Sequence, residues 1–82
     1  MNNSNSMDKK IVGAKQTLKA VKSGAVKAVY VATDADVRVT KSVIEACNEN
    51  NIEIIYVETM QKLGIMCSIE VGAAIACALK KS

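Results

Sequence analysis

Two short apolar segments, residues 28–32 and 54–57, limit most strongly what this chain can fold into. Both are rich in β-branched side chains and neither alternates polar with apolar residues, which is typical of strands covered on both faces. Segments with helical spacing precede and follow them, so the order of elements predicts an α/β domain whose helices pack on its sheet. The chain has 82 residues, enough for one such domain but not for two separate cores.

Residues 14–22 predict the first helix of the domain. Three apolar residues at helical spacing are expected to form its buried face: Ala14, Leu18 and Val21. On a helical wheel Lys15, Lys19 and Lys22 lie within about 60° of one another, roughly a quarter turn from that face. The lysines can therefore point into solvent while the apolar side chains pack on the sheet.

Two further helices and a last strand are expected. Residues 37–50 form a helix with Asp36 as its N-cap. Its predicted apolar face consists of Val39, Val43, Ile44, Ala46 and Cys47. A shorter helix begins at Thr59 and is ended by Gly64. Residues 73–79 combine the alanine content of a helix with the unbroken apolarity of a central strand, and we interpret them as a strand because the sheet needs one more.

The composition excludes several classes of function. The chain has no histidine, so it can form no imidazole base, no Ser-His or Cys-His nucleophile and no zinc site that needs imidazole. Its aromatic residues are two tyrosines, too few for a platform that stacks unpaired bases. The three cysteines form no CxxC pair; we interpret them as reduced, buried thiols, with a disulfide between two of them as the alternative: Cys47, Cys67 and Cys77.

The polar, asparagine-rich residues 1–8 are expected to be a disordered tail without a secretory signal, followed by a folded domain at residues 9–82. The longest apolar run, residues 72–79, is far shorter than the ~20 residues of a membrane helix. We therefore expect a cytoplasmic monomer with no membrane partner.

Basic charge is concentrated near the N-terminus. The net charge is +3, from 11 basic and 8 acidic residues, yet residues 9–27 contain six lysines and no acidic residue. This distribution predicts a surface that binds a polyanion, with a solvated helix face as the alternative.

Residues 13–19 combine the features of a nucleic-acid contact. The free N–H groups and the positive dipole end of a helix start favour phosphate, and Gly13 has no side chain to hold a nucleic-acid backbone away. Lys15 and Lys19 add positive charge, while the amide of Gln16 offers both a donor and an acceptor to a base edge.

A second candidate site is the loop after the first predicted strand, where Asp34 and Asp36 stand at the position at which α/β sheets place ligands. The pair could hold magnesium for phosphoryl chemistry. The chain offers no phosphate loop and no second carboxylate cluster, however, so helix capping and loop hydrogen bonds are the favoured role. We expect no metal, no cofactor and no enzymatic activity.

Three segments in order, GAKQTLKAVKSG, AVYVATDAD and IIYVETMQKLGIMCSIEVGAA, resemble those of the ribosomal protein L7Ae family, and the chain looks like a small bacterial member from about Lys10 to Leu79. The resemblance implies a three-layer α/β/α sandwich around a four-stranded mixed sheet. It also implies recognition of kink-turn RNA, in which a bulge flanked by tandem sheared G·A pairs bends a duplex sharply. The partner would be ribosomal RNA or a riboswitch.

By resemblance, Lys15 and Gln16 stand where archaeal and eukaryotic members have Asn-Glu, and the helix start contacts the guanines of the sheared pairs. Asp36 falls at an acidic loop position that can accept from an exposed base edge. A loop that packs on an extruded nucleotide falls on residues 69–71, with core or edge packing as the alternative. The full implied RNA-binding set is Gly13, Ala14, Lys15, Gln16, Lys19, Lys22, Asp36, Ile69, Glu70 and Val71.

The chain departs from the family pattern around the extruded-base pocket. Met60 stands where many relatives have a basic residue, with Lys62 as a shifted substitute, and Val71 replaces an arginine of some members. Ser68 replaces a common glycine, and Val37 a common proline. The alternative function is a protein-interaction or assembly module that keeps the fold without binding RNA.

Overall fold

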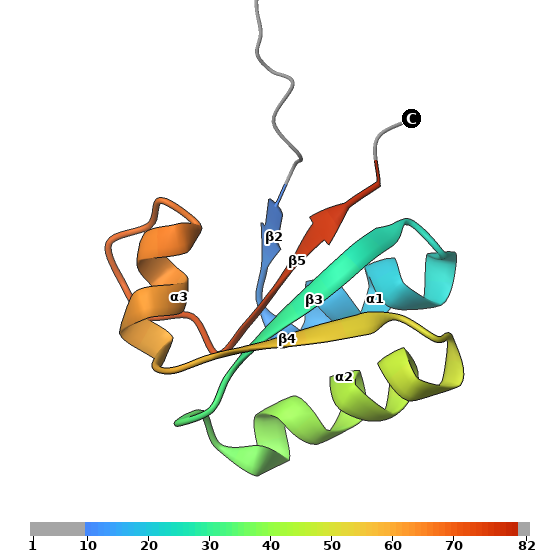
Figure 1. Cartoon of the computed structure of the whole chain (residues 1–82), viewed down its shortest axis with the longest axis horizontal. Helices are drawn as coiled ribbons and strands as arrows, with labels where there is room; N and C mark the ends of the chain where they lie inside the picture. Colours follow the sequence, from blue (N-terminus) through green and yellow to red (C-terminus); the bar gives the residue numbers. More distant parts are fainter. Residues whose placement is uncertain (1–9, 81–82) are drawn as a thin grey trace, which may run out of the picture.

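A four-stranded mixed sheet forms the centre of the molecule (Figure 1). The computed structural model describes residues 10–80, so the predicted tail at residues 1–8 lies outside the described residues. The elements follow one another as β2 (Lys10–Val12), α1 (Ala14–Ser23), β3 (Val26–Ala32), α2 (Val37–Glu49), β4 (Glu53–Val57), α3 (Met60–Met66) and β5 (Ile75–Leu79). The strand order is β2-β5-β3-β4, with β3 and β4 parallel and β5 antiparallel to both of its neighbours.

The helices cover both faces of this sheet. On one face α1 and α2 pack side by side, and Val21 of α1 and Val43 of α2 share an apolar cluster with Val29 of β3. On the other face Leu63 of α3 packs with Ala32 and Ala76. Since successive residues of a strand point to opposite faces, β3 and β5 contribute to both clusters. The arrangement confirms the three-layer α/β/α sandwich.

The central position of β5 explains the composition of the last predicted strand. It lies between β2 and β3, and its residues 75–78 are all buried. Ile75 and Cys77 face α1 and α2, whereas Ala76 belongs to the cluster under α3. A strand covered on both faces has no polar positions, so the apolar run is a strand, as predicted, although it begins at Ile75.

The first helix agrees with its prediction. It begins after Gly13 and ends at Gly24, whose φ of 78° is left-handed, as a glycine at this position allows. Val21 is buried, Ala14 and Leu18 are half-buried, and Thr17 and Ala20 complete the buried face.

Three predicted details are wrong. Strand β4 is not covered on both faces, because it lies at the edge of the sheet and Tyr56 is 58% exposed. Val39 is 44% exposed, since the buried face of α2 begins with Thr40 and continues through Val43. Gly64 does not end α3, which continues to Met66. A glycine is needed inside that helix because a Cβ there would collide with the carbonyl oxygen of Val71.

Candidate functional site

Two helix starts and two loops meet at the edge of the sheet that is formed by the ends of its strands, and not by an edge strand. Because β2, β3 and β4 run parallel to one another, their carboxyl ends lie at the same edge, where β5 begins. This edge carries the starts of α1 and α2 and the loop at residues 67–74. The Gly13 N–H donates to the Ile75 carbonyl (2.9 Å) and the Ala32 N–H to the Ala74 carbonyl (2.9 Å), so the segments are tied together.

The loop between β3 and α2 is fixed to α3 by hydrogen bonds. The Thr33 hydroxyl donates to the Glu58 carbonyl at 2.8 Å. Asp34 Oδ1 accepts from the backbone N–H of Met60, also at 2.8 Å. The Met60 carbonyl in turn accepts from the Ala73 N–H at 3.0 Å. Asp34 therefore has the loop hydrogen-bonding role that the sequence favoured.

The start of α1 has an open N-terminus without a side-chain cap. Gly13 has a φ of 113°, which disfavours any side chain there, and no side chain caps the helix. The first turn contains no acidic residue. Since the first N–H groups of a helix have no intrahelical acceptor, those after Gly13 face outward with the positive end of the helix dipole.

The polar face of α1 is exposed as predicted: Lys15, Gln16, Lys19 and Lys22 all lie on the surface. Two hollows flank this face. One is lined by Leu18 together with the four exposed residues, and the other lies between α1 and the strands β2 and β5. Gln16 and Lys19 line both hollows, so these two side chains stand on the ridge between them.

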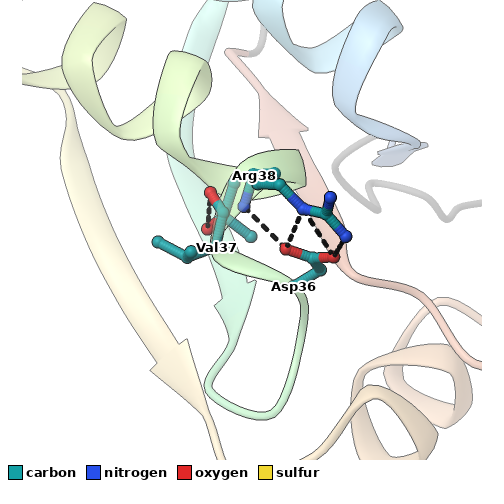
Figure 2. A network of polar contacts seen from close by, with 4 residues as sticks. Asp36, Val37 and Arg38 are labelled. Carbon is teal, nitrogen blue, oxygen red and sulfur yellow. Dashed lines mark hydrogen bonds and ion pairs between the residues drawn. The ribbon is translucent and has the colours of Figure 1, made fainter.

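The start of α2 carries an ion pair (Figure 2). Asp36 caps the helix, as predicted, by accepting from the Arg38 N–H at 2.9 Å. The same carboxylate accepts from the Arg38 guanidinium, with Nη2 to Oδ2 at 2.8 Å. These bonds hold the pKa of Asp36 below its ordinary value. Sequence reasoning missed Arg38, although a cation two residues after a capping aspartate was a visible signal.

The three predicted RNA-contact residues of the loop before β5 differ in their exposure to solvent. Ile69 is half-buried and packs in the cluster under α3, as the alternative had it. Glu70 and Val71 are exposed, with Val71 at 70%. Ser68, at the position where the resemblance implies a glycine, has a left-handed φ of 61°, a backbone conformation that glycine favours.

Lys62, the possible substitute for the basic residue that Met60 replaces, already forms an ion pair with Glu58. Lys62 Nζ lies 2.9 Å from Glu58 Oε1 on the surface, and this lysine lowers the pKa of Glu58. Its charge is thus balanced by Glu58, which lies four residues earlier and just before α3.

The three cysteines are free thiols. Cys47 and Cys77 are buried and Cys67 is half-buried, and burial raises the pKa of each.

Metal-binding clusters and membrane-spanning helices are both absent from residues 10–80. There, no three side chains of histidine, cysteine, aspartate or glutamate lie close enough together to suit a metal ion. The same part of the chain has no helix long and apolar enough to cross a membrane.

Known proteins resemble this chain both in sequence and in fold. Residues 2–82 match the model of the ribosomal protein L7Ae/L30e/S12e/Gadd45 family. The chain is 56% identical over 68 residues to the RNA-binding protein TTE2299 of Caldanaerobacter subterraneus subsp. tengcongensis, covering 83% of each chain. It is 43% identical over 70 residues to the RNA-binding protein YbxF of Geobacillus stearothermophilus, covering 85% of each chain.

Two solved structures share the fold. The Giardia lamblia 15.5kD RNA binding protein superposes with a TM-score of 0.83 at 26% identity, covering 89% of this chain and 62% of that one. A protein with unknown function from Bacillus halodurans C superposes with a TM-score of 0.79 at 24% identity, covering 87% of this chain and 71% of that one.

Proposed function

This chain belongs to the ribosomal protein L7Ae/L30e/S12e/Gadd45 family, and from that premise we propose that it is a non-enzymatic protein that binds RNA and recognises kink-turns. The observation that carries the proposal is the uncapped, acid-free start of α1, where Lys15, Gln16 and Lys19 are exposed together. Relatives that cover most of its length are named RNA-binding proteins, which supports RNA as the partner.

The chemistry of this helix start suits the sheared G·A pairs of a kink-turn. A lysine ammonium donates to O6 and N7 of guanine, and the Gln16 amide can bridge a donor and an acceptor on neighbouring base edges. The free N–H groups after Gly13 hold a phosphate close to the bases that are read. Ala14 lies at this turn without obstructing it, and Lys22 adds charge about two turns further along the helix.

The same edge of the sheet offers a second contact to the RNA. Val71 is exposed and Glu70 lies beside it, so Val71 can cover the face of an extruded nucleotide while Ile69 anchors the loop from below. Asp36 lines this edge at the start of α2. Ordinary A-form RNA hides its bases in a deep, narrow groove, so these contacts need an irregular, opened site.

We propose that binding stabilises the kinked form of the RNA by mass action, because a ligand that prefers one conformation shifts the population toward it. The partner is a structured RNA such as ribosomal RNA or a riboswitch, and the protein acts as a cytoplasmic monomer.

The proposal is tested by titrating the protein into a kink-turn duplex and into a matched duplex whose tandem G·A pairs are replaced by Watson-Crick pairs. Each base contact is worth about 1–3 kcal/mol, so we expect the kink-turn to bind at least about tenfold more tightly. Equal affinities would overturn kink-turn recognition. Absence of binding to both duplexes would instead favour an assembly module.

A further inference from the structure

We infer that Arg38, oriented by Asp36, contacts a backbone phosphate of the bound RNA; the inference rests on the proposed function and adds a contact at α2 to those at α1. Its basis is the geometry of the ion pair at the start of α2 and the place of that helix in the fold (Figure 2).

The carboxylate holds one edge of the guanidinium. Oδ2 of Asp36 accepts from Arg38 Nη2 at 2.8 Å and from Nε at 3.2 Å, and Oδ1 lies 3.3 Å from Nε. The cap bond from the Arg38 N–H fixes the same carboxylate to the backbone. The guanidinium is therefore oriented by a carboxylate that also caps the helix, although the arginine side chain is 88% exposed.

Orientation, and not stability, is the main consequence of this pair. Exposed ion pairs contribute little to the free energy of unfolding, because water screens both charges. An arginine carries five N–H donors in a planar fork, however, and Asp36 uses those of a single edge. The donors on the opposite edge point into solvent with a fixed geometry, which suits the two oxygens of a phosphate.

The fold places this fork beside the proposed RNA site. Helices α1 and α2 pack against each other on one face of the sheet. Both begin at the edge that also carries the loop at residues 67–74. RNA bound at the start of α1 therefore extends along the start of α2. We assign to Arg38 the phosphate of that strand, because the planar fork of a guanidinium matches two phosphate oxygens.

The pair also changes what Asp36 does. A bare carboxylate at this edge would repel the phosphates of an approaching RNA, whereas the pair with Arg38 is neutral and presents donors. Asp36 is then a positioning residue that acts through Arg38. Replacing Asp36 and Arg38 singly and together distinguishes this positioning role from one in which Arg38 only neutralises the charge of Asp36.

The experiment measures affinity for the kink-turn duplex over a range of salt concentrations for the parent, R38A, R38K, D36N and the double variant D36N/R38A. The amide that D36N introduces keeps an oxygen that can cap α2, and residue 38 keeps its N–H in every variant. K80A is the matched control, because Lys80 is an exposed cation that follows β5 at the opposite edge of the sheet.

We expect R38A to bind about tenfold more weakly, as for the loss of one charged hydrogen-bonded contact. The slope of log affinity against log salt should become shallower by about 0.7–0.9, the value for one phosphate. R38K should keep the parent slope but lose several-fold in affinity, because an ammonium cannot form the fork. Adding R38A to D36N should again lower both affinity and slope, and K80A should leave both unchanged.

The inference is overturned if R38A binds within about twofold of the parent or keeps its salt slope. It is also overturned if D36N/R38A binds like D36N, because Arg38 would then act only by neutralising Asp36. The preference of the parent for the kink-turn duplex over its Watson-Crick counterpart tests the proposed function separately. A parent that binds both duplexes equally but loses affinity on R38A would overturn kink-turn recognition and leave the phosphate contact intact.

Discussion

The backbone N–H of Met60 donates a 2.8 Å hydrogen bond to Asp34 Oδ1, which joins the loop after β3 to the first residue of α3. Thr33 and Glu58 form a second bond between the same segments. An aspartate at the carboxyl end of a strand thus joins the loops that form the edge of the site.

We expect Asp34→Ala to lower the free energy of unfolding by about 1 kcal/mol, because the Met60 N–H at the start of α3 loses its acceptor. Asp34→Asn is the matched control, since its amide oxygen can accept the same bond. Denaturant unfolding monitored by circular dichroism measures both. Equal destabilisation by the two substitutions would show that the charge of Asp34, and not its hydrogen bond to Met60, contributes to the free energy of unfolding.

The two ends of the basic face of α1 should behave differently. Gln16→Ala should weaken binding to the kink-turn duplex by about 1–3 kcal/mol and reduce the preference over the Watson-Crick duplex, since a base contact is lost. Lys22→Ala, about 10 Å further along the helix, should weaken binding to both duplexes alike and make the salt dependence shallower, as for a phosphate contact. Titrations of both duplexes at several salt concentrations measure this. An unchanged preference in the Gln16 variant would remove that residue from base recognition.

Gly64→Ala should destabilise the protein by about 1–3 kcal/mol, because the added methyl group collides with the Val71 carbonyl and one of the two segments must move. The loop at residues 69–71 would shift with it, so affinity for the kink-turn duplex should also fall. Gly72→Ala is the control: its Cβ would approach Met60 Cβ to 3.2 Å, a milder contact. If Gly64→Ala unfolds like the parent, the close approach of α3 to this loop is absent in solution.

The cysteines should differ in their reaction with a thiol reagent at neutral pH. Burial raises the pKa of all three thiols, which lowers the reactive thiolate fraction. Cys67 is half-buried and should react first, whereas Cys47 and Cys77 should react only on unfolding. Labelling followed by mass spectrometry, with and without denaturant, measures the order. Rapid labelling of Cys77 in the folded protein would contradict its central position in β5.

Periodicity and local chemistry were sufficient for much of the fold. The caps of α1 and α2 depend on residues next to the helices, so Gly13 and Asp36 could be assigned from the sequence. The unbroken apolar run that ends at Leu79 could be assigned to a strand, because a domain with this order of elements needs one more strand in its sheet. These are properties of short segments and of element order.

What the sequence did not predict depends mainly on contacts between distant segments. Tyr56 is exposed because the strand order leaves β4 at an edge, which the segment itself does not encode. The close approach of Gly64 to Val71 joins a helix to a later loop, so nothing next to Gly64 distinguishes it from a glycine that ends a helix. The pairing of Arg38 is local, in contrast, but a long side chain has many rotamers, and the sequence does not show that this one folds back onto the cap.

The central claim is that the protein stabilises a kinked RNA. It is tested most directly by attaching a donor and an acceptor fluorophore to the two ends of a kink-turn duplex and following energy transfer during titration, without divalent cations. We predict that transfer rises with the same concentration dependence as binding, and stays low for the duplex with Watson-Crick pairs in place of the G·A pairs. Saturated binding without a rise in energy transfer would contradict the account.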